Sequence, residues 1–352
     1  MTWGHNPSEG GNYFMPSFKK TGQTLNFACF FFFGHLDSAK IRPRQGTMQA
    51  QPRHLHSLEK TVAVLALFAV LALTFGFAQG AGNKKKPQGD EYDRAQAAQP
   101  EKVFLRSSSV LVQDATSGET ILSKNADAVL PIASITKLMT AMVVLDRGLD
   151  LEDRVVISTE DMDTLKGTQS RLRPGAALSR NELLLLALMS SENRAAAALA
   201  RTYPGGTEVF VDAMNEKARA LGMLSSRFAD STGLTSANVS SPPDLARLVQ
   251  AAHEYPVIRQ YSTQDQAQVN VFGQALQYRN TNGLVRGHTW DIGLSKTGFI
   301  NEAGRCLVMR VRVASKDLVV ILLDSWGKNS RIGDAQRIKK WLETNSALRH
   351  RS

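Results

Sequence analysis

The chain has 352 residues, of which 43% are hydrophobic and 21% are charged, and its formal net charge is +10. This composition is typical of a globular protein that can bury the core of one or two domains. Lysine and arginine are spread along the chain without a basic stripe, which argues against nucleic acid as a partner.

The first 47 residues have no helical or strand period. A secretory signal usually begins within a few residues of the chain start, whereas the signal-like segment of this chain follows Met48 and a short basic region. We therefore interpret residues 1–47 as a doubtful leader, an upstream translation artefact, and expect translation to start at Met48.

An uncharged apolar run of 17 residues, 61–77, follows Lys60 and ends beside Ala78. Its small terminal residues suit a signal peptidase, so residues 48–78 are predicted to be a signal peptide that is cut after Ala78. An uncleaved membrane anchor is the alternative, because a run of this length is at the lower limit for spanning a bilayer. Residues 79–102 are polar and without period, which predicts a flexible spacer. Cleavage would leave a periplasmic protein with peripheral or no membrane contact.

The cysteines and histidines indicate neither a disulfide nor a metal site. Cys29 belongs to the doubtful leader, and Cys306 alone cannot form an internal disulfide in an exported protein. Apolar neighbours predict that Cys306 is a buried structural thiol. His253, His288 and His350 are far apart and lack a ligand pattern, so we expect no metal and no cofactor.

The predicted folded body, residues 103–348, begins with one β-hairpin and ends with a second hairpin and a helix. Between the hairpins the signals are mostly helical, and they include a capping box formed by Ser179 and Glu182. The expected elements are strands at 109–113 and 120–122, helices within 134–252, strands at 306–313 and 317–324, and a helix over 330–348. These elements predict an α+β fold in which helices flank an antiparallel sheet and form a helical subdomain.

The segment PIASITKLMTAMVVL, residues 131–145, is largely apolar yet contains Ser134 and Lys137. Three residues apart on a helix, these side chains share a face, and the amine can reach the hydroxyl. Burial lowers the pKa of a lysine, so Lys137 could act as the base that makes Ser134 a nucleophile, with the helix dipole assisting in the first turn. The spacing alone is weak evidence, because it also occurs at Ser17/Lys20, Ser57/Lys60 and Ser325/Lys328.

A Ser-x-Asn element, Ser191 and Asn193, lies between a strongly apolar helix and an alanine-rich one. At such a break a hydroxyl can face a cleft and relay a proton, while an amide holds a substrate carbonyl. An ordinary interhelical turn is the alternative, and Ser236 and Asn238 form a second match. We prefer the first match because helical flanks fix its side chains, whereas the second lies in a loop.

A third motif, Lys296-Thr297-Gly298, lies in a strand-like run. A strand that presents lysine and threonine to a cleft suits a carboxylate and an amide, and the following glycine permits close backbone approach. The same triplet at residues 20–22 lies in the doubtful leader, and a lone match would ordinarily be just the end of a strand.

In this order the three motifs resemble those of the serine penicillin-recognising enzymes, the penicillin-binding proteins and class A β-lactamases. The segments RFADSTGL, YRNTNGLV and SKTGFINEAGRCLVM extend the resemblance over essentially Val110–Trp341. They are similar to the D-alanyl-D-alanine carboxypeptidase and endopeptidase family of low-molecular-mass penicillin-binding proteins, peptidase S11. The resemblance implies a β-lactamase/transpeptidase-like fold.

The resemblance also implies roles for the residues at matching positions. Ser134 corresponds to the acylated nucleophile and Lys137 to its base. Ser191 and Asn193 correspond to the second element of the proton relay and the substrate hold. The substrate-binding positions correspond to Lys296, Thr297 and Gly298, and the first two contact the substrate's terminal carboxylate. The oxyanion hole corresponds to the backbone N–H groups of Ser134 and Phe299.

The implied reaction is acylation of Ser134 by a D-alanine carbonyl of a peptidoglycan stem peptide, followed by hydrolysis. Carboxypeptidases of the family often carry a second domain, whereas about one helix of chain follows Asp324 here. We therefore expect an endopeptidase that cleaves D-alanyl to meso-diaminopimelate crosslinks. A carboxypeptidase that trims the terminal D-alanine, or a catalytically silent peptidoglycan-binding protein, is the alternative.

Class A β-lactamases carry a glutamate that activates the deacylating water, and the corresponding stretch here, residues 227–234, has none. β-Lactams are therefore expected to be covalent inhibitors that leave slowly. Lys328, after the last strand, is either a further cation for the substrate carboxylate or an ordinary surface lysine.

Overall fold

The structure is a computed structural model that describes residues 103–349. The predicted leader, signal peptide and spacer, together residues 1–102, lie outside the described residues, as does His350. Of the divisions expected from the sequence, only the folded body can therefore be followed in the structure.

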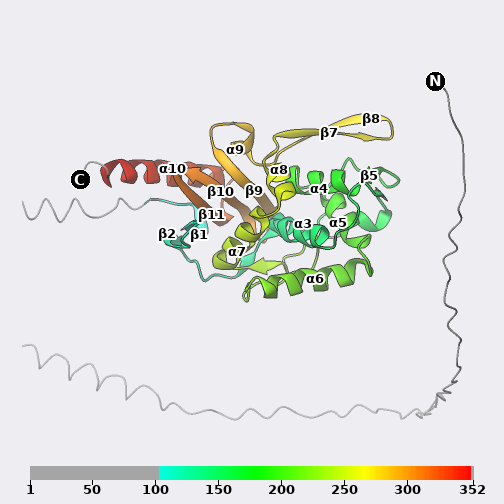
Figure 1. Cartoon of the computed structure of the whole chain (residues 1–352), viewed down its shortest axis with the longest axis horizontal. Helices are drawn as coiled ribbons and strands as arrows, with labels where there is room; N and C mark the ends of the chain where they lie inside the picture. Colours follow the sequence, from blue (N-terminus) through cyan, green and yellow to red (C-terminus); the bar gives the residue numbers. More distant parts are fainter. Residues whose placement is uncertain (1–102, 350–352) are drawn as a thin grey trace, which may run out of the picture. The chain divides into compact units, whose positions relative to one another are not determined.

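A five-stranded antiparallel sheet joins the beginning and the end of the folded body, in the order β2-β1-β11-β10-β9 (Figure 1). The central pairing aligns Val110 with Leu322. Both hairpins predicted from the sequence are confirmed, and the Lys-Thr-Gly motif lies on the edge strand β9. The strands are β1 (Ser107–Asp114), β2 (Thr120–Lys124), β9 (Asp291–Ile300), β10 (Gly304–Val313) and β11 (Lys316–Ser325).

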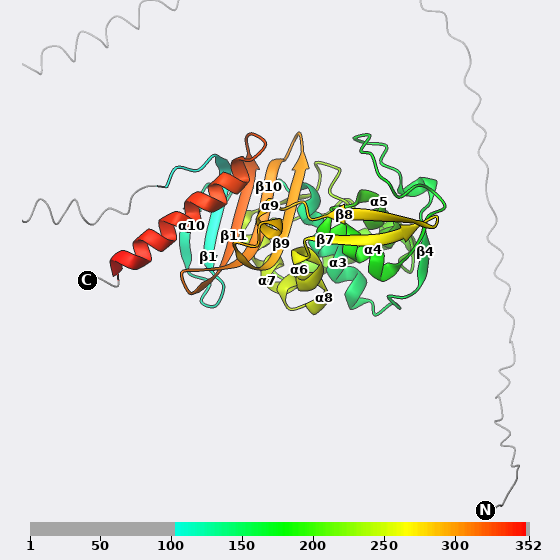
Figure 2. The ribbon, with the colours of Figure 1, turned by 90° about the horizontal axis from the view of Figure 1, so that it is seen from above.

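Both faces of this sheet are buried, because successive side chains point to opposite hydrophobic clusters. Leu111 and Ile321 belong to the cluster shared with the helical region. Val112 and Leu322 belong to the cluster that includes residues of α10 (Ser330–Arg349), the helix against the other face (Figure 2). Burial on both faces explains why the strands read as nearly continuous apolar runs. The helix predicted over residues 330–348 is confirmed.

The helical region is built around α3 (Lys137–Asp146), which is apolar on most of its circumference and buried over most of its length. The predicted capping box is present at the start of α4, where Ser179 Oγ accepts from the Glu182 N–H and a Glu182 carboxylate oxygen accepts from the Ser179 N–H. The helices around α3 are α4 (Arg180–Met189), α5 (Asn193–Arg201), α6 (Gly206–Ala220), α7 (Pro242–His253) and α8 (Pro256–Thr263).

Short elements complete the described chain. The hairpin of β7 and β8 is not among the elements expected from the sequence, although β7 alternates polar residues with three buried apolar ones, as half-buried strands do. The short elements are the 3₁₀ turns η1 (Ala133–Thr136) and η2 (Thr159–Asp161), the helix α9 (Gly283–Arg286), and the paired strands β3 (Leu130–Pro131) with β6 (Val239–Ser240), β4 (Arg154–Val156) with β5 (Ala177–Ser179), and β7 (Gln266–Val271) with β8 (Gln274–Arg279).

Within residues 103–349, none of the helices combines the length and the apolar character that crossing a bilayer requires.

Candidate active site

Ser134 lies in the 3₁₀ turn η1, directly before α3, where the chain turns from the sheet into the helical region. The preceding residue, Ala133, has φ of +47°, a left-handed conformation that is costly for a residue with a Cβ. Two glycines hold this turn. A Cβ on Gly233 would lie 2.0 Å from the Ala133 carbonyl oxygen, and one on Gly298 would lie 3.2 Å from the Ser134 nitrogen. The strained turn is therefore packed between two backbone segments that permit no side chain.

Lys137 is the first residue of α3, and its side chain is fully buried. Its Nζ lies 2.8 Å from Ser134 Oγ, 2.8 Å from Asn193 Oδ1 and 2.6 Å from the Thr232 carbonyl oxygen. The amide and carbonyl oxygens can only accept hydrogen bonds, whereas the hydroxyl can also donate. A neutral amine can therefore donate to both of those oxygens and accept the proton of Ser134.

The electrostatics of Lys137 favour that neutral form. Burial lowers the pKa of Lys137 from 10.5 to about 7, although the charges of Asp230 and Glu192 act in the opposite direction. A substantial fraction of the amine is therefore unprotonated near neutral pH. This is the property that a general base for a serine hydroxyl requires.

Ser191 lies in the turn between α4 and α5 and has φ of +61°, a second strained non-glycine position in the site. Its Oγ accepts a hydrogen bond of 3.0 Å from Lys296 Nζ, which also donates to the Thr297 carbonyl. Burial lowers the pKa of Lys296 well below its usual value, and the charges of Lys137 and Arg331 lower it further. The Ser-x-Asn element thus links both lysines, since Ser191 binds Lys296 and Asn193 binds Lys137.

The edge strand β9 passes close to the nucleophile. Gly298 approaches the backbone nitrogen of Ser134, as its contacts above require. Phe299 follows it in β9, with half of its side chain exposed and the Arg305 guanidinium 4.4 Å from its ring centre. Thr297 is buried, and its hydroxyl lies 2.6 Å from that of Thr281. All the motif residues predicted from the sequence are thus gathered around Ser134.

The other matches to the Ser-x-x-Lys and Ser-x-Asn patterns lie in other parts of the chain or have structural roles. Asn238 is buried, donates to Thr136 Oγ1 and accepts from the Ala229 N–H, so it holds the loop that carries the Thr232 carbonyl. Ser325 ends β11, and Lys328 is exposed in the loop that follows. The matches before residue 103 lie outside the described residues.

Three residues of the site were not singled out from the sequence: Thr232 and Thr281, which lie within the segments RFADSTGL and YRNTNGLV, and Arg331. Arg331 belongs to α10, and its Nη1 donates to the carbonyls of Gly298 (2.8 Å) and Cys306 (3.1 Å). Burial lowers its pKa to about 10, which leaves it a cation at neutral pH. Nothing in a terminal amphipathic helix distinguishes this arginine before the helix is docked on the sheet. Arg331, rather than Lys328, is the additional cation beside the Lys-Thr-Gly strand.

Cys306 is confirmed as a buried free thiol on β10, and burial raises its pKa to about 11. It lies opposite Gly298 in the register of β9 and β10, on the side of the sheet core. Its place there is structural.

Comparison with known proteins agrees with this geometry. Residues 94–326 match the peptidase S11 family, described as D-alanyl-D-alanine carboxypeptidase. A D-alanyl-D-alanine endopeptidase of Pseudomonas aeruginosa is 50% identical over 242 residues, which cover 68% of this chain and 78% of that protein. The D-alanyl-D-alanine endopeptidase of Escherichia coli is 46% identical over 254 residues, which cover 72% and 81%. The crystal structure of the Streptomyces K15 DD-transpeptidase superposes with a TM-score of 0.64 at 27% identity and covers 68% of this chain and 98% of its own.

Proposed function

This chain belongs to the D-alanyl-D-alanine carboxypeptidase family, peptidase S11, and we propose that it is a serine endopeptidase that cleaves D-alanyl crosslinks in peptidoglycan. The observation that carries this proposal is the 2.8 Å contact between Ser134 Oγ and the fully buried Lys137 amine, whose pKa is about 7. A serine beside a half-neutral lysine is equipped for acyl transfer.

In the acylation step, Ser134 Oγ attacks the D-alanine carbonyl while neutral Lys137 takes the hydroxyl proton. The backbone N–H groups of Ser134 and Phe299 stabilise the tetrahedral oxyanion. Its collapse breaks the C–N bond, and the leaving amine receives the proton from Lys137. Water then attacks the acyl ester, gives a proton to Lys137, and releases the peptide carboxylate as that proton returns to Ser134 Oγ.

The cations around β9 suit the leaving group. Lys296 and Arg331 stand beside Thr297 and Gly298, and neither forms an ion pair with a carboxylate among the described residues. A carboxylate on the carbon next to the leaving nitrogen occurs both in a D-alanyl-D-alanine end and in a D-alanyl to diaminopimelate crosslink. Its binding would restore the charged form of Lys296, whose burial without an anion is unfavourable.

The endopeptidase subtype rests on the relatives. Those named D-alanyl-D-alanine endopeptidases are 41–50% identical to this chain, whereas a relative named D-alanyl-D-alanine carboxypeptidase from Bacillus subtilis is 31% identical. Purified crosslinked muropeptides and pentapeptide muropeptides distinguish the two activities. Conversion of dimers to monomers supports the endopeptidase, and release of free D-alanine from pentapeptides alone supports the carboxypeptidase.

Labelling with fluorescent penicillin tests the nucleophile. The wild-type protein should give a stable labelled band on a denaturing gel, and Ser134→Ala should give none. Ser236→Ala, which removes an exposed loop serine of the competing Ser-x-Asn match, is the matched control and should label normally. A folded wild-type protein without label would favour a silent binding protein, and a labelled Ser134→Ala variant would mean that another serine is the nucleophile.

Release of the β-lactam should be slow. The stretch that would carry a deacylating glutamate offers Asp230, but that carboxylate accepts from the backbone N–H groups of Thr232 (2.7 Å) and Thr235 (3.0 Å). It therefore builds the loop and is not free to activate water. We expect the penicillin adduct to remain bound for longer than the acylation assay lasts. Multiple rapid turnovers of penicillin would contradict this expectation.

Export completes the proposal: residues 1–47 are an artefact of the assigned start, 48–78 a cleaved signal peptide and 79–102 a spacer before the catalytic domain at 103–348. The apolar run at 61–77 supports it. N-terminal sequencing of the protein from a periplasmic extract should begin at Gln79, whereas an intact apolar segment in a membrane fraction would indicate an anchor.

A further inference from the structure

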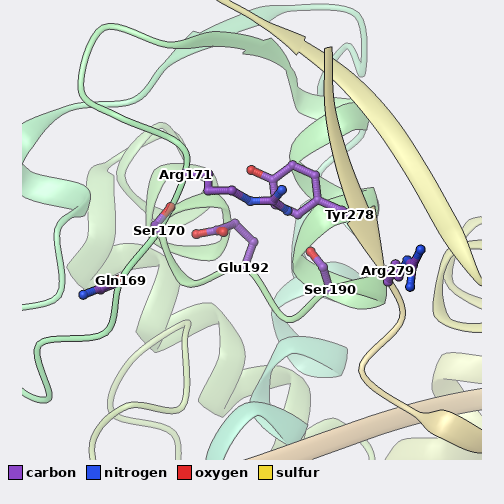
Figure 3. Close-up of a pocket in the computed structure, with 7 residues that line it drawn as sticks. All are labelled: Gln169, Ser170, Arg171, Ser190, Glu192, Tyr278 and Arg279. Atoms are coloured by element: carbon purple, nitrogen blue, oxygen red, sulfur yellow. The ribbon is translucent and has the colours of Figure 1, made fainter. Parts of the chain in front are cut away.

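A pocket of about 330 Å³ adjoins the Ser-x-Asn turn and is not used by the mechanism above. Three segments line it: the loop at residues 169–171, the turn residues Ser190 and Glu192 on either side of Ser191, and the end of β8. In Figure 3, Gln169 and Arg279 stand at the two ends of the pocket, and the Glu192 carboxylate points toward Ser170.

The pocket carries charges of both signs that are not neutralised by the protein. Arg171, Arg279 and Glu192 all line it, and among residues 103–349 none of the three belongs to an ion pair. Within the described part of the chain, Glu192 accepts a single hydrogen bond, of 3.2 Å, from the Arg194 N–H at the start of α5. One negative and two positive side chains thus line a shared space, and none of them has an ion-pair partner among the described residues.

Tyr278 forms a rigid wall of this pocket. Its side chain is buried, and the Arg171 guanidinium lies across its ring, 3.9 Å from the ring centre (Figure 3). The Tyr278 hydroxyl has no hydrogen-bond partner among the described residues. Burial raises the pKa of Tyr278 to about 12, so the hydroxyl keeps its proton and remains a donor. Stacking on this ring therefore places the Arg171 guanidinium at the pocket wall.

The position of the pocket indicates which part of a substrate reaches it. The carboxylate of the leaving group is assigned to Lys296 and Arg331, on β9 and α10. Neither of these cations lines the pocket, whose walls are instead the loop at residues 169–171, the residues flanking Ser191 and the end of β8. The pocket is therefore available to the acyl part of the substrate, the stem peptide that becomes bound to Ser134.

We propose that this pocket binds a side chain of the acyl-donor stem peptide that ends in an ammonium and a carboxylate on one carbon, as the free end of meso-diaminopimelate does. The ammonium faces Glu192, and the carboxylate faces Arg171, with Arg279 adding positive charge. A simple amine would leave both arginines unpaired, and a simple carboxylate would be repelled by Glu192. The inference rests on the proposed function, since it names a specificity determinant of that site.

The test compares three synthetic crosslinked peptides that share one scissile D-alanyl bond and one acceptor. Their donor residue is meso-diaminopimelate, lysine, which lacks the carboxylate, or N-acetylated diaminopimelate, which lacks the ammonium. For the full-length enzyme, kcat/KM should be about tenfold higher for free diaminopimelate than for either analogue, as for the loss of one charge-assisted hydrogen bond.

Single charge removals then assign the partners. Arg171→Gln should abolish the preference over lysine, and Glu192→Gln, which can still accept at the α5 N-terminus, should abolish the preference over the N-acetylated donor. Because Glu192 also influences Lys137, only ratios between donors within one variant are compared. Arg173→Gln, in the same loop, and Glu216→Gln, on α6, are exposed controls outside the pocket and should keep the wild-type ratios.

Fluorescent penicillin separates the two possible failures. Equal kcat/KM for the three donors, or unchanged ratios in Arg171→Gln and Glu192→Gln, in proteins that label with penicillin, would overturn the pocket assignment and leave the endopeptidase intact. Absence of labelling and of crosslink cleavage in the wild-type protein would instead overturn the proposed function. If a variant does not label with penicillin, the kcat/KM values of the wild-type enzyme for the three donors still test whether the pocket prefers free diaminopimelate.

Discussion

Lys137 shows how one buried residue can determine the chemistry of this site. Its amine has three oxygen neighbours, two of which only accept hydrogen bonds, so the neutral amine is fully satisfied when Ser134 donates to it. Burial supplies the shift toward that neutral form. In the proposed mechanism, activation of Ser134 therefore depends on the burial of this lysine, and not on its spacing from the serine alone.

The first prediction concerns pH. Because the pKa of Lys137 is lowered to about 7, the base is protonated and inactive below that pH and neutral above it. The rate constant for acylation by penicillin should rise with pH and level off above neutrality, as measured by stopped-flow or timed gel labelling. Lys137→Arg keeps a permanent charge and should slow acylation by roughly 10²- to 10⁴-fold across the range. A flat profile from acid to alkaline pH in the wild type would contradict this assignment.

The second prediction concerns Gly233, which has φ of +81° and lies against the Ala133 carbonyl. Gly233→Ala places a methyl group where backbone atoms already are, so it should destabilise the fold by at least about 3 kcal/mol and reduce penicillin labelling. Gly118→Ala is the matched control, since Gly118 has φ of +73° but open space around it. Urea unfolding measures both. Equal losses in the two variants would mean that the left-handed backbone, and not the close approach, is what matters.

Among the elements, α10 has the clearest double task. It covers one face of the sheet with apolar side chains and brings Arg331 to the carbonyl of Gly298. Its packing face could be read from the sequence, because Ile338 and Leu342 recur at helical spacing. The direction of Arg331 could not, since it depends on the register at which the helix lies on the sheet.

A third prediction concerns the anchor of this helix. Asp334 is buried on α10, and its carboxylate accepts from the Ser107 N–H (2.7 Å), the Ser107 hydroxyl (2.6 Å) and the Arg106 N–H (3.0 Å) of the chain at β1. Asp334→Asn should lower the free energy of unfolding at pH 7 by about 2 kcal/mol, because hydrogen bonds to a buried charge are lost. Asp212→Asn, exposed on α6, is the control and should change it little.

The pH dependence of that loss has a definite sign. Burial acts to raise the pKa of Asp334, but the hydrogen bonds from Ser107, Arg106 and Arg337 outweigh it and lower the pKa. The stabilisation by Asp334 is therefore present above its unfolded pKa of about 3.9. It is lost as the pH falls through the lower folded value. The difference between wild type and Asp334→Asn should shrink in acid, and a constant difference down to pH 2 would argue against a charge effect.

At the scale of the whole molecule, the active site is an assembly of distant segments. Lys137 comes from α3, Lys296 from β9 and Arg331 from α10, and they lie close enough for Lys137 and Arg331 to lower the pKa of Lys296. Strand β9 is joined through β10 to β11, which pairs with β1. The result is a cluster of basic groups that is suited to binding an anion. The antiparallel sheet is thus the frame that brings its edge strand and the C-terminal helix to the start of α3.

The fourth prediction tests that cluster. Arg331→Gln should raise KM about tenfold for a substrate with a carboxylate beside the leaving nitrogen and should leave KM for the corresponding amide nearly unchanged, because only the carboxylate pairs with the cation. Lys328→Gln removes the exposed lysine nearby and should change neither. Equal effects of Arg331→Gln on both substrates would indicate that Arg331 only positions the Gly298 backbone.

The sequence by itself determined the order of the main elements, apart from the β7–β8 hairpin, together with the two sheet hairpins and the three motifs, because each depends on neighbours within one strand, helix or turn. Tertiary structure decided the features that depend on contacts between elements. It selected Asn193 over Asn238 as the partner of Lys137, added Thr232 and Arg331, and buried the lysine whose pKa the chemistry needs. Local spacing fixes which side chains share a face, whereas desolvation and contacts between elements exist only after those faces have packed.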